Sequence, residues 1–439
     1  MHSLPPTIDS ILRTPELAGR GPDDAEVMRL AKEPSFRTDL LAEATKIANE
    51  FSYQPEVNPA GFSLQAGGML HPMSPFRCNS SVCRRRNVRA FAQVASLYSD
   101  TTILTDLFSF GLLNKAESNS PWQDQEVADL AADIHTILEL EPLIRSGALQ
   151  FSSPIHRLCE VHDKPTRELA SRVGERGFEL LLRDMNVNFE QDWLTVSGAA
   201  VLGNTSVGLR LPRHQIGAIK GLKSKAEIHR SVARKFKKEL VEELVCRAQY
   251  AMVDCICAAE AGATIAATSP IDILASRAVF EPVPEPAIEM DVSLAGRLNL
   301  PWIPQLTPSE LVDLRERALH ALPNFRLEIA RSIQSSTSAD LKAIAKSLQN
   351  EVVGLDVELR AALAKRTGGG PAAILLGLGM ILCGIATANP LVSAAGAPLV
   401  AGGCSLWSTD KSAVSAVESA RSKPAYVLLS ARELLEERH

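Results

Sequence analysis

The sequence predicts a mainly α-helical protein with a minor β component, an α+β fold. Three observations support this class. Aromatic residues make up only 5% of the chain, which argues against a large β-sandwich and for helices that pack through Leu, Ala and Val. Several long segments carry apolar residues three and four positions apart, which is the period of an amphipathic helix. The segments with strand character are short and lie between Thr101 and Leu211.

The bulk composition predicts a globular protein of two or three domains. The chain has 439 residues, of which 46% are hydrophobic and 22% charged, so it can form a sizeable core. The formal net charge of −5 gives no overall attraction to nucleic acid or anionic lipid. Eight cysteines are too few for a disulfide framework, and the first residues lack the basic and apolar runs of a secretory signal. We therefore expect a cytoplasmic protein.

The first part of the chain is expected to combine helices with short strands. Residues 1–57 predict an N-terminal mixed helical segment, and residues 58–279 predict an α+β domain with a long basic helix. Within that domain, residues 58–79 are rich in Gly, Pro and Ser, which predicts an irregular loop. Residues 101–105 and 149–151 have the apolar and β-branched character of short buried strands.

Further elements of this domain are predicted from local chemistry. Residues 120–123 (Ser-Pro-Trp-Gln) match a capping box with proline at the first helical position, so we expect a helix to begin there. Residues 193–196 and 207–211 resemble two strands joined by turn residues, which predicts a β-hairpin. A long helix is then expected from about residue 225 to residue 261.

The last third is predicted to be a helical domain, residues 302–439, after a proline-rich linker at 280–301. Residues 307–310 (Thr-Pro-Ser-Glu) predict a capped helix start, and Pro323 is expected to kink or restart that helix. Between residues 338 and 363, apolar positions recur at nearly heptad spacing. This helix is expected to pack on the apolar segment that follows it or to form a coiled coil in a homo-oligomer.

The most unusual feature of the sequence is residues 367–409, a Gly/Ala-rich apolar stretch without a charge. Asn389-Pro390 divides it into halves of about 17 or 18 residues, slightly fewer than the roughly 20 of a comfortable membrane span. A helical hairpin buried in a soluble core, a hairpin inserted into a membrane, and a flexible segment are three alternatives. The candidate residues for contact with a membrane or protein partner are Leu376, Ile381, Ile385 and Trp407.

Two groups of residues are candidate ion-binding sites. The first is a structural zinc site, which needs four N or S ligands in a tetrahedral arrangement; its candidates are Cys78, Cys83, His156 and Cys159. Unrelated thiols and surface histidines are the alternative for these four. No other cofactor is predicted. Two other groups are too common in proteins to define a site by themselves. They are residues 84–86 (Arg-Arg-Arg) and the pair of Asp133 and His135.

The second group is the basic segment 213–238, which has nine Lys or Arg residues against one acid. It could bind the phosphates of nucleic acid or of lipid headgroups, and Lys235, Lys237 and Lys238 are the candidate contacts. A solvated helix face is the alternative interpretation. Because Phe236 is its one aromatic residue, the segment gives no support for base stacking.

No known catalytic signature was found in the sequence, which favours a non-enzymatic protein. An enzyme without recognisable motifs is a third alternative to the two hypotheses that follow. The leading hypothesis is a non-enzymatic regulatory or effector protein whose apolar hairpin engages a membrane or a protein partner. The amphipathic helix at 338–363 would shield the hairpin until a trigger releases it. The alternative is a soluble cytoplasmic binding module that uses the basic segment for nucleic acid or other polyanions, and that zinc could stabilise. The location is expected to be cytoplasmic, with membrane association through residues 367–409.

Overall fold

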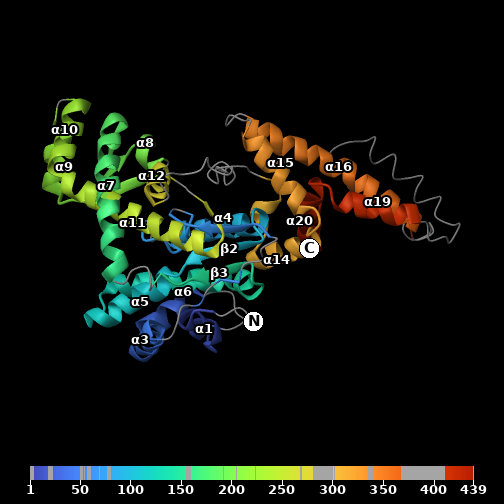
Figure 1. The fold of residues 1–439 in the computed structure, drawn as a ribbon, viewed down its shortest axis with the longest axis horizontal. Helices are drawn as coiled ribbons and strands as arrows, with labels where there is room; N and C mark the ends of the chain where they lie inside the picture. The colour runs from blue at the N-terminus through green and yellow to red at the C-terminus, as the bar shows by residue number, and fades with distance from the viewer. Residues whose placement is uncertain are drawn as a thin grey trace. The chain divides into compact units, whose positions relative to one another are not determined.

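The fold is given by a computed structural model (Figure 1). The structure describes residues 4–17, 23–49, 53, 55–56, 61–68, 70–76, 81–154, 160–190, 192–203, 205–222, 224–266, 269–279, 300, 302–334, 340–366 and 411–438. These residues are mainly helical with a smaller β component, as predicted. The chain divides into two units, which are described separately: unit 1 comprises residues 1–95 and 99–292, and unit 2 comprises residues 96–98 and 293–439.

Unit 1 is built on a parallel sheet of four strands in the order β3-β2-β1-β7. The strands are β1 (Ser63–Ala66), β2 (Thr101–Thr105), β3 (Leu149–Ser152) and β7 (Thr264–Ala266). The strands expected at 101–105 and 149–151 are confirmed. The irregular loop expected at 58–79 is wrong for its centre, because β1 lies there and pairs with β2 and β7 on its two sides.

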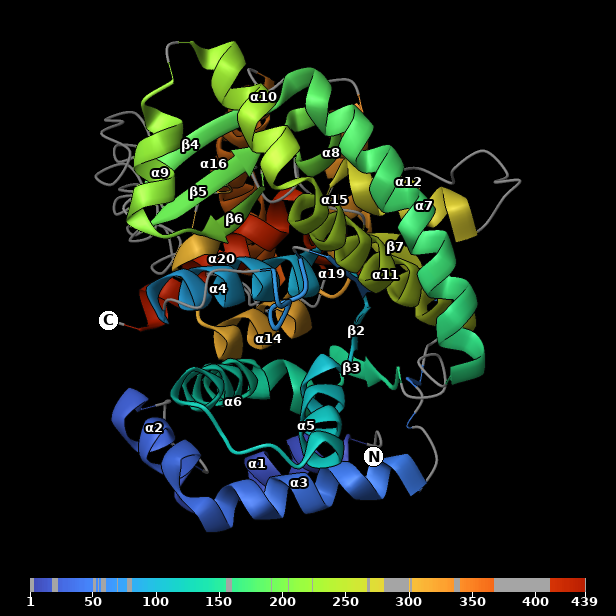
Figure 2. The same cartoon turned by 90° about the vertical axis from the view of Figure 1, so that its left-hand side faces the viewer.

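Helices connect these strands and cover the sheet (Figure 2). Between β1 and β2 lies α4 (Ser81–Leu97), and between β2 and β3 lie α5 (Leu107–Ser118) and α6 (Asp124–Arg145). The helix α11 (Lys237–Ala261) packs on β1, β2 and β7, and α12 (Pro270–Val279) follows β7 and packs on α11. The chain therefore moves outward from β1 to β3 and then returns to the other side of β1.

Three helices precede the sheet and pack on its connecting helices. They are α1 (Pro6–Arg13), α2 (Asp24–Lys32) and α3 (Pro34–Asn49). The helix α2 contacts α6, and α3 contacts α5. The Asp23 side chain caps α2 by accepting a hydrogen bond from the Ala25 backbone N–H at 2.9 Å. This cap fixes the start of α2 at Asp24. The Asp24 carboxylate lies close to His135 of α6.

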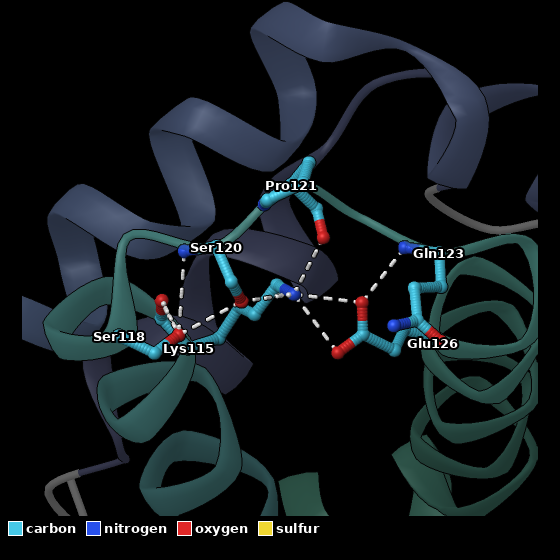
Figure 3. Close-up of polar contacts among 6 residues, drawn as sticks. All are labelled: Lys115, Ser118, Ser120, Pro121, Gln123 and Glu126. Atoms are coloured by element: carbon cyan, nitrogen blue, oxygen red, sulfur yellow. Dashed lines mark hydrogen bonds and ion pairs between the residues drawn. The ribbon is translucent and has the colours of Figure 1, made fainter.

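The start of α6 differs from the sequence prediction and is shown in Figure 3. The helix begins at Asp124 rather than within residues 120–123, and the Gln123 backbone N–H donates to Glu126 Oε2 at 2.8 Å. Lys115 Nζ lies 2.8 and 2.7 Å from the two Glu126 oxygens, and it also donates to the Pro121 carbonyl at 3.1 Å. Because Lys115 holds this carbonyl, Pro121 stays in the connection between α5 and α6.

A second, smaller sheet lies in the segment between β3 and β7. Its antiparallel strands are β4 (Asn186–Glu190), β5 (Trp193–Ser197) and β6 (Ser206–Arg210), in that order. The expected hairpin is confirmed as β5 and β6, but α8 (Ala199–Leu202) separates them. The strand β4 was not predicted because its sequence, NVNFE, is largely polar.

Besides α8 and α12, four helices share a core with this smaller sheet. They are α7 (Glu160–Asp184), α9 (Arg213–Lys220), α10 (Lys225–Lys235) and the first half of α11. The single helix expected over 225–261 is divided at Phe236, which is buried and forms the C-cap of α10. The Phe236 backbone lies outside the helical region, with φ −117° and ψ 22°, and this separates α10 from α11.

Unit 2 contains the short 3-10 helix η2 (Ile303–Gln305) and five α-helices in its described part. These are α14 (Pro308–Arg317), α15 (Leu322–Gln334), α16 (Asp340–Arg366), α19 (Lys411–Arg421) and α20 (Ala425–Glu437). The capping box is confirmed, since Thr307 Oγ1 accepts from the Glu310 N–H and Glu310 Oε2 accepts from the Thr307 N–H at 2.7 Å. The restart near Pro323 is also confirmed by α15.

The predicted heptad helix is α16, and its apolar face is buried within unit 2. Leu348, Val352, Leu355 and Leu359 are each 6% exposed or less. The helix contacts α19 and α20, and Asp356 forms a buried ion pair with Arg432 of α20 at 2.7 Å. The predicted apolar hairpin, residues 367–409, lies outside the described residues.

Candidate functional site

The clearest candidate site in unit 1 is a cavity of about 270 Å³ between α2, α4 and α6. We call it the charged pocket. Its apolar lining consists of Val27, Met28, Val88, Ala128, Ala131 and Ala132, and its polar lining consists of Asp24, Arg84, Arg85, His135, Thr136 and Glu139. The lining residues of α6 recur three and four positions apart, so they share one face of the helix. Small alanines on this face leave the space that the cavity occupies.

A carboxylate from α2 joins the polar residues of the other two helices. Arg85 of α4 donates through Nη1 to the two oxygens of Asp24 at 3.2 and 3.0 Å. His135 Nε2 lies 2.8 Å from Asp24 Oδ1. Burial lowers the pKa of His135, although the Asp24 charge opposes this shift. The imidazole is therefore neutral near pH 7.

A second ion pair fixes α4 against α6 beside the pocket. The Arg84 guanidinium binds the Asp133 carboxylate, and only 9% of the Arg84 side chain is exposed. Burial raises the pKa of Asp133 to about 6, while the Arg84 charge acts in the opposite direction. This pair positions the adjacent Arg85 at the pocket, because the two arginines are neighbours on α4.

Among the polar groups of the pocket, Glu139 gives the clearest indication that a ligand binds there. Its Oε2 atom is buried and has no hydrogen-bond partner among the described residues. Burial raises the pKa of Glu139, and the charges of Arg89 and Arg85 oppose the shift. A buried acceptor without a partner costs about 1–3 kcal/mol. A ligand that donates a hydrogen bond at this point would remove that cost.

The carboxyl edge of the parallel sheet is a second place where a site is expected. Ligands of such sheets bind where the strand order reverses, which here is beside β1. At this edge lies a buried network of Gln65, Thr105 and Asp254. Thr105 Oγ1 donates to Asp254 Oδ1 at 2.6 Å and accepts from Gln65 Nε2 at 3.1 Å.

The backbone at this edge packs too closely on the network to leave room for a ligand. The Gly68 N–H donates to Asp254 Oδ2 at 3.3 Å, and a Cβ atom at Gly67 would lie 2.3 Å from the same oxygen. His71 Nδ1 accepts from the Met73 N–H, so its Nε2–H donates to the Thr105 carbonyl at 2.7 Å. We conclude that the network ties β1, β2 and α11 together.

The predicted zinc ligands remain untested by the structure. Cys83 is a free, partly exposed cysteine on α4, whereas Cys78, His156 and Cys159 lie outside the described residues. Within the part of the chain that the structure describes, no three His, Cys, Asp or Glu side chains are grouped to hold a metal ion.

The predicted polyanion contacts are exposed at the junction of α10 and α11. Lys235, Lys237 and Lys238 all face solvent. Lys237 Nζ lies 5.9 Å from the centre of the Phe178 ring. Lys238 Nζ lies 3.8 Å from Glu242 Oε1. The predicted membrane or partner contacts Leu376, Ile381, Ile385 and Trp407 are not among the described residues. In the described ranges, no helix is long and apolar enough to cross a membrane.

The polar residues of the charged pocket were not identified as a site from the sequence. Arg84, Arg85 and His135 were noted without a common function, and Asp24 was not noted at all. One signal was present: on α6, polar residues follow alanines at helical spacing on a face different from the core face. Comparison with known proteins adds no further guide, because no family model, curated protein or solved structure matches the chain.

Proposed function

We propose that this protein is a non-enzymatic regulator or effector that responds to a small ligand bound in the charged pocket. The observation that carries this proposal is the buried, unpartnered Oε2 atom of Glu139 in a cavity of about 270 Å³. In the described residues the pocket presents ion pairs and a neutral histidine, which suit binding and orientation of a ligand.

The lining indicates the chemical class of the ligand. The cavity is slightly smaller than the roughly 300–1,000 Å³ of sites for drug-sized molecules, so a small metabolite fits best. Glu139 requires a hydrogen-bond donor, such as an amino, amide or hydroxyl group. Arg85 supplies a positive charge and hydrogen-bond donors for an acceptor or anionic group. The alanines of α6 accommodate an apolar part of the ligand. We therefore expect a small ligand with a donor group and an acceptor or anionic group.

Filling the pocket should abolish ligand binding. We expect some members of a panel of amino acids, amines and nucleosides to raise the melting temperature of the wild type. At a ligand concentration of 100 times Kd, the stabilisation is about 2.7 kcal/mol. Ala132→Leu places a larger side chain in the cavity and should remove the shift for the same compounds, while Glu139→Gln should reduce it. Thermal unfolding followed by circular dichroism measures each shift.

Ala116→Leu is the matched control, because Ala116 lies on α5 and does not line the pocket. This variant should keep the ligand-induced shift of the wild type. The proposal is wrong if no compound in the panel stabilises the wild type, or if Ala132→Leu retains the full shift.

The output of the protein is proposed to reside in residues 367–409. Two features of the described part support this idea. The flanking helices α16 and α19 pack against each other, and the apolar face of α16 is already buried in unit 2. The uncharged stretch, rather than α16, is therefore the segment proposed to contact a membrane or protein partner. The membrane is the first partner to test.

Flotation with lipid vesicles tests the membrane proposal. The full chain should float with neutral phosphatidylcholine vesicles, because about forty uncharged residues favour an apolar phase. A variant in which a Gly-Ser sequence of equal length replaces residues 367–409 should remain in the lower fractions. Leu376→Lys combined with Ile381→Lys should also reduce flotation, because lysine is costly in the bilayer interior. If all three proteins distribute alike, residues 367–409 do not bind membranes.

A further inference from the structure

The outward face of the smaller sheet in unit 1 is polar and carries one exposed tryptophan. In β5 and β6, buried and exposed residues alternate, as in a sheet with one face on the core. The outward positions of the three strands are occupied mainly by short polar residues: Asn186, Asn188, Glu190, Trp193, Thr195, Ser197, Ser206, Gly208 and Arg210. Trp193 is the large side chain on this face, and it is 47% exposed.

The ring of Trp193 lies against the backbone of the neighbouring strand. A Cβ atom at Gly208 would be 3.3 and 3.4 Å from Cε3 and Cζ3 of the indole. Gly208 lies diagonally across from Trp193, since Thr195 pairs with Gly208 and Trp193 pairs with Arg210. The absence of a side chain at Gly208 lets the ring approach the sheet. One side of the ring is thus supported while much of the indole remains in solvent.

Two exposed arginines lie near this ring in the register and in the sequence. Arg210 is directly opposite Trp193 in the register of the sheet. Arg213 begins α9, its side chain is 89% exposed, and it pairs with Asp192 at 3.0 Å. Two acids also lie nearby. Glu190 of β4 pairs with Trp193 in the register of the sheet, and Asp192 precedes Trp193 in the sequence. The basic segment 213–238 begins at Arg213, the first residue of α9.

We propose that this sheet face binds single-stranded nucleic acid. An unpaired base stacks on Trp193, and Arg210 and Arg213 contact the phosphates on either side of it. Asn188 and Thr195 lie on the same face, where their side chains can hydrogen-bond to base edges. A supported aromatic ring beside exposed cations is the combination that single-stranded nucleic acids require. The aromatic partner missing from the basic segment is thus supplied by β5. This surface is separate from the charged pocket and does not depend on the function proposed for it.

Binding of labelled oligonucleotides to the full chain tests the proposal. Fluorescence anisotropy should show binding of a 15-nucleotide single strand, and a duplex of the same sequence should compete less well. Trp193→Ala should weaken binding by about 5- to 150-fold, which corresponds to one lost base stack, whereas Trp193→Phe should retain most of the affinity. Arg210→Ala and Arg213→Ala should each reduce the slope of log K against log salt by about 0.7.

Two further variants separate stacking on Trp193 from attraction to the basic segment alone. Trp122→Ala is the matched control, because Trp122 lies in the connection between α5 and α6, next to Lys115 and Arg37. The affinity of this variant should equal that of the wild type. Gly208→Val should displace the Trp193 ring and weaken binding. The proposal fails if the wild type binds no single strand at low salt, or if Trp193→Ala binds as the wild type does. It also fails if Lys235→Glu, Lys237→Glu and Lys238→Glu abolish binding while Trp193→Ala leaves it unchanged.

Discussion

Replacing Asp254 by asparagine should remove a strong pH dependence from the unfolding free energy of this protein. The Asp254 carboxyl group is 5% exposed in the network at the carboxyl edge of the parallel sheet. Burial is the main cause that raises its pKa to about 7, and the charge of Asp272 adds to the shift. The hydrogen bonds from Thr105 and the Gly68 backbone act in the opposite direction.

The sign of the effect follows from the proton balance. Between about pH 4 and pH 7 the folded protein keeps a proton on Asp254 that the unfolded chain releases. This contribution to stability is fully present below about pH 4 and is lost as the pH rises through 7. The loss amounts to up to ~1.4 kcal/mol per pH unit for one group. An asparagine side chain at this position cannot titrate, so the variant should lack this part of the slope.

Urea unfolding from pH 4.5 to 8, followed by circular dichroism, measures the effect. The unfolding free energy of Asp254→Asn minus that of the wild type should increase with pH up to about pH 7 and then level off. Glu126→Gln provides a contrast of opposite sign, because the hydrogen bond from Lys115 lowers the pKa of Glu126. Its wild-type contribution is lost as the pH falls below about 4.5, so this variant is measured below that pH. Parallel curves for Asp254→Asn and the wild type between pH 4.5 and 7 would contradict the assignment.

Gly174→Ala should destabilise unit 1 strongly, although alanine is the better helix former. Gly174 is a buried residue of α7 at its contact with α11. A Cβ atom there would lie 2.4 Å from Val245 Cγ2, 2.9 Å from the Val245 backbone nitrogen and 3.1 Å from its Cα. The two helix backbones must separate to admit it. Overpacking of this kind costs about 1–3 kcal/mol and sometimes more, which exceeds the roughly 1 kcal/mol gained in helix propensity.

The same substitution elsewhere gives a control of opposite sign. Gly111 lies on α5, and a Cβ atom at this position meets nothing within 4 Å. Gly111→Ala should therefore stabilise the protein by up to about 1 kcal/mol. Adding Val245→Ala to Gly174→Ala should recover only the part of the loss that is due to Cγ2, because the backbone contacts remain. Equal melting temperatures for Gly111→Ala and Gly174→Ala would show that α7 and α11 are not in close contact.

The strands show what the sequence can and cannot reveal about this fold. Residues 101–105 were identified because Thr-Thr-Ile-Leu-Thr is the β-branched, apolar run of a strand buried on both faces. The equally buried β1 reads Ser-Leu-Gln-Ala. One of its two polar residues, Gln65, donates a hydrogen bond to Thr105, forty positions later. Local pattern holds no sign of such a partner, so β1 was interpreted as part of a loop.

The charged pocket escaped prediction for a similar reason. Asp24 and Arg85 are 61 positions apart, and His135 lies on a third helix. Each is an ordinary surface residue in its own segment, and only the packing of α2 and α4 on α6 brings them together. The helix starts were predicted more successfully at 307–310 than at 120–123. At 120–123, Lys115 of the preceding helix donates hydrogen bonds to the Pro121 carbonyl and to the Glu126 carboxylate. These contacts keep Pro121 outside α6.

The pairing of β7 with β1 has a consequence for synthesis of the chain. Leu64 is paired with Thr264, two hundred positions later, so one side of β1 has no neighbour until most of unit 1 has left the ribosome. At about 5–20 residues per second, this delay is roughly 10 to 40 s. An open strand edge can pair with other chains during that time. Cells that produce this protein quickly should accordingly depend on chaperones to keep the nascent sheet from aggregating.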